Sequence, residues 1–338
     1  MTQLRVMQSF RAPRPTTNPY ITMLDRALGD SGEVLHLRFD WRRALVGDYD
    51  VFHWHWPEGK LHGSTWWRTA GKTALTAALW LRLRLSHRIA VVRTVHNVEL
   101  PDDGRLRRAL LARIERDADL LIALNSETQL DGRPHARIPH GHYRDWYAGQ
   151  PRAQRVRGRI SAFGGVRRYK NVGVLVDAYA DASSHRADLS LEIGGRPSTP
   201  ELAETLQQRA ESLPNVDMRL RFLPDDELVR LATQSELVVL AYRFMHNSGS
   251  VLAALSLDRP VLVPRNPVNE ALALEVGDAW VHMYDGELRG DQLLAALAGV
   301  EAIPAGAQPD LTLREWARTA ADHADAYRRA VEIKRAQA

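Results

Sequence analysis

Apolar segments of strand length alternate with segments of helical periodicity along the first half of the chain. Near the N-terminus, "LRVMQSF" is followed by the helical pattern "NPYITMLDRALGD", then by "EVLHLRF" and "DVFHWHW". Strands that alternate with helices predict βαβ units and a parallel sheet. The alternation lapses at residues 148–158, where "AGQPRAQRVRG" is polar and contains Gly and Pro. Such a composition is typical of a loop, and we place a domain boundary there.

The second half of the chain starts the same alternation again. "GRISAFGGV" has the pattern of a strand, and the apolar residues after it recur at i, i+3, i+4 and i+7, as on one face of a helix. These residues are Val172, Leu175, Val176 and Tyr179. The strand-like segments "LSLEIGG", "MRLRFL", "ELVVLAY" and "PVLVP" follow in turn.

Together these patterns predict an α/β protein with two doubly wound Rossmann-like domains that face a cleft. A chain of 338 residues fits two domains of about 150 residues each. We expect one domain in residues 1–150 and a second domain in residues 158–310. Residues 311–338 are predicted to form a helix that packs back toward the first domain.

Composition narrows the possible chemistry. The chain has no cysteine, which excludes disulfides, thiolate catalysis and cysteine-ligated zinc. No apolar run reaches the about 18 residues of a membrane span, and the N-terminal segment lacks the pattern of a signal peptide. We therefore expect a cytoplasmic protein.

Positive charge and tryptophan both concentrate in the first domain. Residues 1–150 hold 22 Lys and Arg against 16 Asp and Glu, or +6, which leaves 23 against 25, or −2, for the rest. Seven of the nine tryptophans lie in the same half, three of them in the helical segment near residues 64–86. That segment fits an ordinary surface helix and also a shallow membrane-docking helix, so peripheral contact with the inner membrane face stays open. No basic stripe or nucleic-acid-binding module is present, and we expect no nucleic-acid partner.

A polar stretch rich in Ser and Gly separates a predicted strand that ends at Tyr242 from the next predicted helix. Asn247, Ser248, Gly249 and Ser250 stand at the start of that helix. The unpaired N–H groups of a first helical turn, together with the helix dipole, favour an anion such as a diphosphate. The alternative is that Asn247 or Ser248 only caps the helix.

Two further strand ends of the second domain carry glycines or cations. Gly165 ends one strand, and Arg167 and Lys170 precede the next helix, a pattern that suits a phosphate clamp. Gly194 and Gly195 end another strand. Taken singly, these are also ordinary features, a solvated basic turn and a glycine-terminated strand. Ligands of open parallel sheets bind at the carboxyl ends of strands, so together these residues predict a nucleotide-diphosphate site.

The first domain offers polar side chains at its own strand ends. His53 and His55 alternate along a strand with Glu58 just past its end, and His96 and Asn97 follow another strand. Two histidines could ligate a metal, but no third ligand is evident and we predict none. Glu58 is a candidate general base and His96 a candidate site residue. A purely structural role is the alternative for each histidine.

The order of these motifs resembles a known family. "FGGVRRYKNVGVLVDAY", "LEIGGRP", "RFLPDDELVRLATQSELVVLAY" and "NSGSVLAALSLDRPVLVP" resemble the donor domain of bacterial GT-B glycosyltransferases of the glycosyltransferase 4-like group. The first half is similar in "TVHN" and in "ERDADLLIALNSET" leading to "IPHGHY". The resemblance covers roughly residues 4–300. It implies the GT-B fold, with an acceptor-binding domain in residues 1–150 and a nucleotide-sugar-binding domain in residues 158–310.

The resemblance implies transfer of a hexose of mannose, glucose or glucuronate type from a GDP- or UDP-sugar. The implied acceptor is a glycolipid or polysaccharide in exopolysaccharide or cell-envelope synthesis, and no cofactor or essential metal is implied. By the same resemblance, Arg167 and Lys170 grip the diphosphate, the serines of 248–250 contact the phosphates, and His96 lines the site beside the transferred sugar.

One departure from the family pattern concerns the mechanism. Many retaining members carry two glutamates eight residues apart, at positions that are Met245 and Ala253 here. An inverting reaction would need a base in the first domain, for which Glu58 is the candidate and Asp102 and Asp103 are rivals. A nucleotide-sugar 2-epimerase and a non-catalytic nucleotide-sugar-binding protein are the alternatives that the sequence leaves open.

Overall fold

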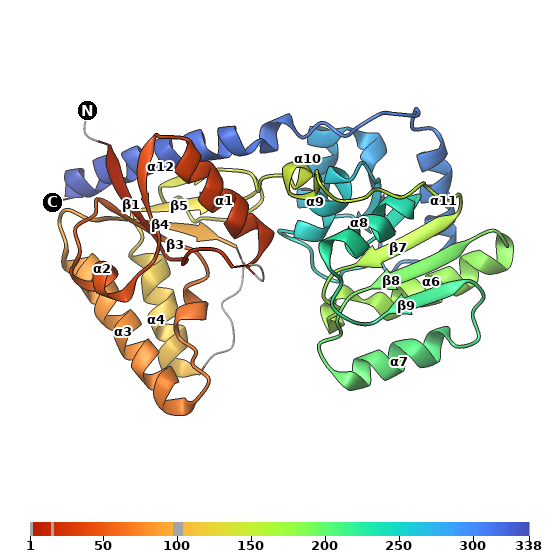
Figure 1. Cartoon of the computed structure of the whole chain (residues 1–338), viewed down its shortest axis with the longest axis horizontal. Helices are drawn as coiled ribbons and strands as arrows, with labels where there is room; N and C mark the ends of the chain where they lie inside the picture. The colour runs from red at the N-terminus through yellow and green to blue at the C-terminus, as the bar shows by residue number, and fades with distance from the viewer. Residues whose placement is uncertain (1–2, 15–16, 97–103, 338) are drawn as a thin grey trace. The chain divides into compact units, whose positions relative to one another are not determined.

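The computed structural model describes residues 3–14, 17–96 and 104–337. The chain forms two compact units (Figure 1). Unit 1 comprises Met1–Gly141 with Leu313–Ala338, and unit 2 comprises His142–Thr312.

Unit 1 contains a six-stranded sheet in which every neighbouring pair is parallel. All six residues of the strand "AVVRTV" are buried, as expected for a central strand covered on both faces. The strand order reverses between the first and third strands, which is the switch point of a doubly wound sheet. The order is β2 (Val34–Leu37), β1 (Leu4–Gln8), β3 (Val51–Trp54), β4 (Ala90–Val95), β5 (Leu120–Ala123) and β6 (His135–Arg137).

Helices cover both faces of this sheet (Figure 1). Phe52, Trp54 and Val91 point to one face, where they pack with residues of α2 (Trp41–Val46), α3 (Trp66–Leu85) and α4 (Arg105–Arg116). The other face is covered by α1 (Pro19–Asp30) and α12 (Trp316–Gln337). A short 3-10 helix, η1 (Pro57–Lys60), follows β3. The helix expected in residues 311–338 thus lies in unit 1.

Unit 2 has its own six-stranded parallel sheet, which reverses its order between β7 and β10. Leu237 pairs with Ile160 across this switch point. Two doubly wound parallel sheets were predicted from the alternating pattern, and both are confirmed. The order is β12 (Val281–Tyr284), β11 (Val261–Pro264), β10 (Leu237–Val239), β7 (Arg159–Phe163), β8 (Ser190–Gly194) and β9 (Val216–Arg219).

The helical period predicted after β7 is also confirmed. Leu175, Val176 and Tyr179 are buried in one core cluster with Leu293 and Leu297. The first three belong to α6 and the last two to α11, which pack together on the same face of the sheet. The helices of unit 2 are α5 (Arg144–Tyr147), α6 (Val172–His185), α7 (Pro200–Ala210), α8 (Asp225–Gln234), α9 (Gly249–Ser256), α10 (Pro267–Val276) and α11 (Gly290–Glu301).

The compact units divide after Gly141, whereas the sequence predicts a boundary at residues 148–158. The difference has a physical cause, because the polar segment bonds to unit 2. The indole of Trp146 donates to Asp225 at 2.9 Å, and the backbone N–H of Ala153 donates to Thr233 at 2.9 Å. The residues in and just before this segment are therefore bonded to α8, so the segment belongs to unit 2.

Candidate active site

Two glycines bring the loops after β7 and β8 into backbone contact. Gly164 has φ +99°, and a Cβ on Gly195, whose φ is +157°, would lie 1.9 Å from the carbonyl oxygen of Gly164. A side chain at Gly194 would instead meet Leu223 at 2.3 Å, so this glycine makes room for the core. By contrast, nothing lies within 4 Å of the Cβ position of Gly165, which is exposed. Of the predicted glycines, Gly165 is the one that leaves open space beside the loop.

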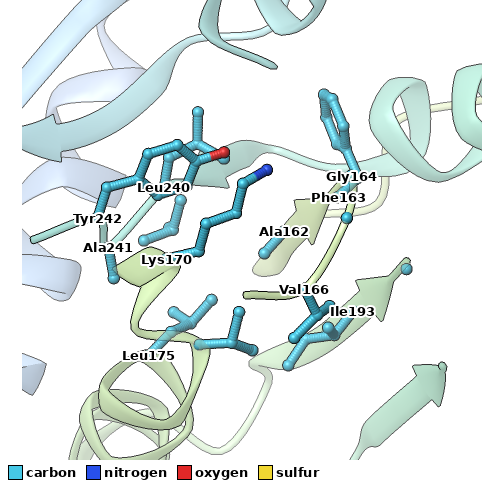
Figure 2. Close-up of a pocket in the computed structure, with 14 residues that line it drawn as sticks. Ala162, Phe163, Gly164, Val166, Lys170, Leu175, Ile193, Leu240, Ala241 and Tyr242 are labelled. Carbon is cyan, nitrogen blue, oxygen red and sulfur yellow. The ribbon is translucent and has the colours of Figure 1, made fainter. Parts of the chain in front are cut away.

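Lys170 and Ser250 meet at this loop although they are 80 positions apart in sequence. A Cβ placed on Gly164 would be 3.2 Å from the hydroxyl oxygen of Ser250 and 3.3 Å from Nζ of Lys170. Figure 2 shows Lys170 extended toward the loop, with the ring of Tyr242 beside it. The ammonium lies 4.9 Å from the centre of that ring. An ammonium and a hydroxyl therefore converge at the switch point of unit 2, where doubly wound folds bind ligands.

Within the described part of the chain, neither Lys170 nor the exposed Arg167 forms an ion pair, and the buried hydroxyl of Tyr242 has no hydrogen-bond partner there. Uncompensated cations and an unused hydroxyl favour an anionic ligand with acceptor oxygens. The site thus suits a diphosphate.

The start of α9 supplies backbone donors to the same site. Ser248 is the N-cap, and its hydroxyl accepts from the N–H of Val251 at 3.4 Å. The capping interpretation is therefore correct for this hydroxyl, but the N–H groups of Gly249 and Ser250 still begin the helix. Asn247 lies on the loop just before the cap. First-turn N–H groups beside an ammonium are the usual arrangement for binding phosphate.

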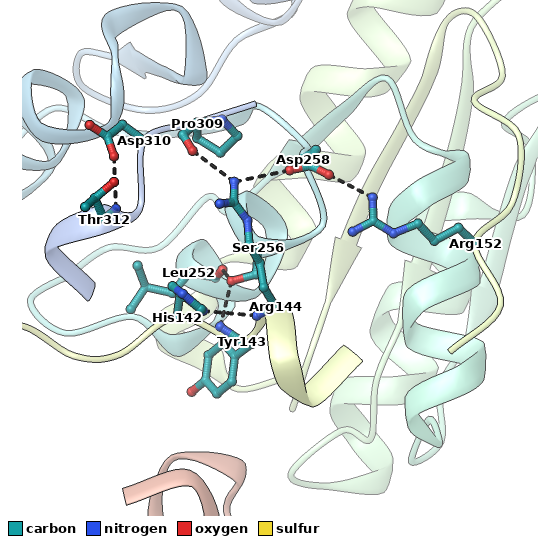
Figure 3. Close-up of polar contacts among 10 residues, drawn as sticks. All are labelled: His142, Tyr143, Arg144, Arg152, Leu252, Ser256, Asp258, Pro309, Asp310 and Thr312. Carbon is teal, nitrogen blue, oxygen red and sulfur yellow. Dashed lines mark hydrogen bonds and ion pairs between the residues drawn. The ribbon is translucent and has the colours of Figure 1, made fainter. Parts of the chain in front are cut away.

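The other end of α9 is held by the segment that precedes β7 (Figure 3). The N–H of Tyr143 donates to the hydroxyl of Ser256 at 2.8 Å. Arg152 pairs at 2.7 Å with Asp258, which follows the helix, and Arg144 reaches the same carboxylate at 3.5 Å. These contacts fix the helix that carries Ser250.

Unit 1 gathers neutral polar groups at the carboxyl ends of its strands. Nδ1 of His55 lies 3.3 Å from Nε2 of His96, which follows β4. The ring of Trp56 stacks on His96 with centroids 3.6 Å apart and an interplanar angle of 15°. Trp56 achieves this with a left-handed backbone, φ 42°. The predicted site residue His96 is thus held by two neighbours.

His53 in β3 and His55 just after it are both hydrogen-bonded to other side chains. His53 contacts the hydroxyls of Tyr327 and Thr94, both at 2.8 Å, and its ring lies 4.0 Å from that of His55. Within residues 3–14, 17–96 and 104–337, no group of three or more His, Asp or Glu side chains is arranged to hold a metal ion.

The candidate base Glu58 lies in η1 and is half-buried. Its charge acts on Arg93, which also pairs with Glu115 of α4 at 2.5 Å. Burial lowers the pKa of Arg93 although these carboxylates raise it. The rival candidates Asp102 and Asp103, and Asn97, lie outside the described residues.

Burial favours the neutral form of five histidines of unit 1. It lowers the pKa of His53, His55 and His96 well below the usual value, and neighbouring histidines lower these pKa values further. Burial likewise lowers the pKa of His140 and of His323 to about 4. At neutral pH these rings serve as hydrogen-bonding groups and carry no charge.

Several residues of this site do not stand out in the sequence. Gln8 and Tyr327 contact the histidines from β1 and α12. The sequence gives Tyr327 only as one position of an apolar helical stripe. Trp56 next to two alternating histidines is a weak signal, because its importance lies in a backbone angle.

Two doubly wound parallel sheets, with a cationic switch point in the second, define the GT-B class of glycosyltransferases. The fold matches a crystal structure of a glycosyltransferase involved in avilamycin A biosynthesis, with a TM-score of 0.60, 15% identity, and coverage of 97% of this chain and 98% of that one. It also matches HepE of Anabaena in complex with UDP and glucose, with a TM-score of 0.60, 13% identity, and coverage of 99% and 98%. No family model matches the chain.

Curated sequences place the chain within this class. It is 40% identical over 326 residues to a GDP-mannose:glycolipid 4-beta-D-mannosyltransferase of Xanthomonas campestris pv. campestris, covering 96% of this chain and 92% of the relative. A second protein of the same name and pathovar is 39% identical over the same length. The chain belongs to the family of these mannosyltransferases. The predictions of a GT-B glycosyltransferase and of a hexosyltransferase activity are confirmed.

The buried histidines predict a loss of stability in acid. Unfolded histidines bind protons below about pH 6.5, whereas His140 and His323 do so only near pH 4. Between these values the unfolded state binds more protons, so the free energy of unfolding falls as pH falls, by about 3 kcal/mol per histidine over the whole window. Urea unfolding at pH 7.5, 6.0 and 5.0 measures this slope.

The variant His323→Gln should flatten the pH slope, whatever it does to stability at pH 7.5. The exposed His87 is the matched control, and His87→Gln should leave the slope unchanged. Equal slopes in the wild type and His323→Gln would contradict the prediction.

Proposed function

We propose that the protein transfers mannose from GDP-mannose to a lipid-linked saccharide and forms a β-linkage. The observation that carries the proposal is the convergence of Lys170 and Ser250 at Gly164, an uncompensated ammonium beside the start of α9. The named activity of the 40% identical relatives supplies the nucleotide, the sugar and the acceptor class.

The cations of unit 2 would act on the leaving group. As the bond between the sugar and GDP breaks, negative charge develops on the diphosphate. The ammonium of Lys170, the guanidinium of Arg167 and the N–H groups of Gly249 and Ser250 stabilise that charge without reorganisation. These groups take the role that a divalent cation has in other phosphate sites, so the proposed reaction needs neither a metal nor a cofactor.

The proposed stereochemistry is inversion. The sugar of GDP-mannose is α-linked, so a β-product requires a single displacement with a base to deprotonate the acceptor hydroxyl. Met245 and Ala253 are buried apolar residues where retaining relatives of the fold carry glutamates, and they offer no carboxylate to the sugar. Glu58 remains the candidate base, with Asp102 and Asp103 as rivals. The 2-epimerase and binding-protein alternatives are not favoured, because the relatives are transferases over nearly the whole chain.

We further propose a cytoplasmic protein that touches the membrane through α3. None of the described helices is both long and apolar enough to cross a bilayer. On α3 the buried residues are Thr76, Leu79 and Leu83. At about 3.6 residues per turn, Trp67 and Leu85 lie on the opposite side, where they are 56% and 66% exposed.

The outer face of α3 therefore carries a second apolar stripe. Trp66, next to this stripe, is 83% exposed, and Leu106 at the start of α4 is 75% exposed. Arg84 and the exposed Arg105 and Arg108 add positive charge along the two helices. Exposed tryptophan and leucine among arginines match a surface of anionic lipid, which is where a lipid-linked acceptor resides.

The nucleotide site is tested with Lys170→Ala. Loss of a charge-assisted contact should weaken GDP binding about tenfold or more, measured by titration calorimetry. Arg289→Ala, which removes an exposed arginine of unit 2 that pairs with Asp291, is the control and should bind GDP like the wild type. Unchanged affinity in Lys170→Ala would remove this residue from the site.

Donor and stereochemistry are tested together by slow hydrolysis of radiolabelled nucleotide-sugars. GDP-mannose should be hydrolysed in preference to UDP-glucose and UDP-glucuronate. Proton NMR at early times should detect β-mannose, because water attacks from the same side as the acceptor. Release of α-mannose would indicate retention, and preference for a UDP-sugar would contradict the proposed donor.

The membrane surface is tested by co-sedimentation with phosphatidylglycerol vesicles. Binding should exceed binding to phosphatidylcholine vesicles and decrease with salt, since the attraction is partly electrostatic. Replacing Trp67 and Leu85 by Ser should reduce binding severalfold, whereas the control Leu274→Ser, which changes an 80% exposed leucine of unit 2, should not. Equal sedimentation of both variants would refute the assignment of α3.

A further inference from the structure

Six side chains form a continuous hydrogen-bonded chain through unit 1. They come from β1, β3, β4, α12 and the residues that follow β3 and β4. The successive contacts are Thr94 Oγ1 to His53 Nε2 at 2.8 Å, His53 Nδ1 to Tyr327 OH at 2.8 Å, Tyr327 OH to Gln8 Nε2 at 2.9 Å, Gln8 Oε1 to His55 Nε2 at 3.2 Å, and His55 Nδ1 to His96 Nε2 at 3.3 Å.

Each contact in this chain holds one hydrogen, so the donors can be assigned in order. The amide nitrogen of Gln8 can only donate, so the oxygen of Tyr327 accepts and its O–H is directed to His53. The amide oxygen of Gln8 can only accept, so His55 carries its proton on Nε2. A neutral His55 then has its lone pair on Nδ1, which accepts from Nε2–H of His96.

We infer that Gln8, His55 and Tyr327 are positioning residues that hold His96 as the Nε2–H tautomer. The lone pair of His96 is then on Nδ1, and a ligand group that meets this atom must donate a hydrogen, as a sugar hydroxyl does. The inference rests on the proposed function in taking His96 as a residue of the sugar site.

The plane of the imidazole is set separately from its tautomer. Trp56 stacks on the ring of His96, and Tyr20 meets it edge-on at 5.5 Å and 82°. The left-handed backbone of Trp56 costs about 1 kcal/mol, and this cost must be offset by the packing that it allows. Stacking fixes the orientation of the ring, and the chain from Gln8 fixes its protonation, so His96 is preorganised in both respects.

The neutrality of the rings makes this assignment possible. His53 and His55 are buried and His96 is half-buried; among the described residues, the charged or titratable groups that act on His96 are His55, His140, His323 and Arg93. None of these favours a proton on His96, since burial and all four groups lower its pKa. Each neutral ring carries one proton. Exchanging donor and acceptor in one hydrogen bond would therefore require the same exchange in every other hydrogen bond of the chain.

The isosteric variant Gln8→Glu tests the inference. A carboxylate accepts from both Tyr327 and His55, and it stabilises a second proton on His55. That proton sits on Nδ1 and donates to Nε2 of His96, which moves the proton of His96 to Nδ1. Gln8→Glu should therefore switch His96 to the opposite tautomer.

The tautomers are distinguished by long-range proton–nitrogen correlation spectra of protein labelled with ¹⁵N-histidine, with His96 assigned by comparison with His96→Gln. The wild type should have Nε2–H at His96, and Gln8→Glu should have Nδ1–H. A wild-type spectrum with Nδ1–H, or the same tautomer in both proteins, would overturn the inference. The spectra report the tautomer of His96 whether or not GDP-mannose is the donor. A failure of the proposed function would instead appear in the hydrolysis experiment with radiolabelled nucleotide-sugars.

Ser9→Ala is the matched control. The hydroxyl of Ser9 is buried and bonds the backbone of His55, accepting from its N–H at 2.7 Å, but does not contact the ring. This variant should retain the wild-type tautomer. In turnover of GDP-mannose, Gln8→Glu should lower kcat about tenfold or more and leave GDP affinity unchanged. A merely structural role of Gln8 would lower the stability of Gln8→Glu and leave the tautomer of His96 unaltered.

Discussion

The proposed nucleotide site depends on the close approach of two backbones, those of Gly164 and Gly195. Because a Cβ at Gly195 would lie 1.9 Å from the Gly164 carbonyl oxygen, any side chain there would push the loops after β7 and β8 apart. The position of Gly164 in turn determines where Lys170 and Ser250 meet. The ammonium of Lys170 and the start of α9 can thus converge because Gly195, in the loop after β8, has no side chain.

Unit 1 is constrained by polar groups instead of glycines. Five of the six side chains from Thr94 to His96 are buried, and a buried polar group without a partner costs more free energy than a satisfied one gains. Tyr327 belongs to α12 and contacts both His53 and Gln8. The C-terminal helix therefore completes a polar network whose other members all come from the first third of the sequence. Packing of α12 and protonation of His96 are consequently parts of one network.

Patterns in the local sequence predicted the features that are formed by residues close together in the chain. The alternation of strands and helices, the buried face of α6 and the capped start of α9 at Ser248 all follow from spacing and from the chemistry of caps. The bond between Gln8 and Tyr327 joins residues 319 positions apart, and no local pattern contains it. The left-handed backbone of Trp56 was not predictable from the local sequence either. The polar residues 148–158, where the sequence suggested a boundary, belong to unit 2. Composition alone does not distinguish donors that face solvent from donors that bond to a neighbouring helix.

The two units differ in the kind of polar group that they present, and the difference fits the chemistry of glycosyl transfer. In the proposed reaction charge develops on the leaving diphosphate, and unit 2 offers Lys170 and Arg167, neither of which pairs with a carboxylate among the described residues. The groups that unit 1 places at its strand ends are neutral rings held neutral by burial. A neutral imidazole can accept from a hydroxyl without adding positive charge beside a sugar centre that itself becomes positive in the transition state. Burial of the histidines lowers stability in acid, but it keeps the rings neutral. Neutral rings suit a proposed site that orients sugar hydroxyls beside a carbon that becomes positively charged in the transition state.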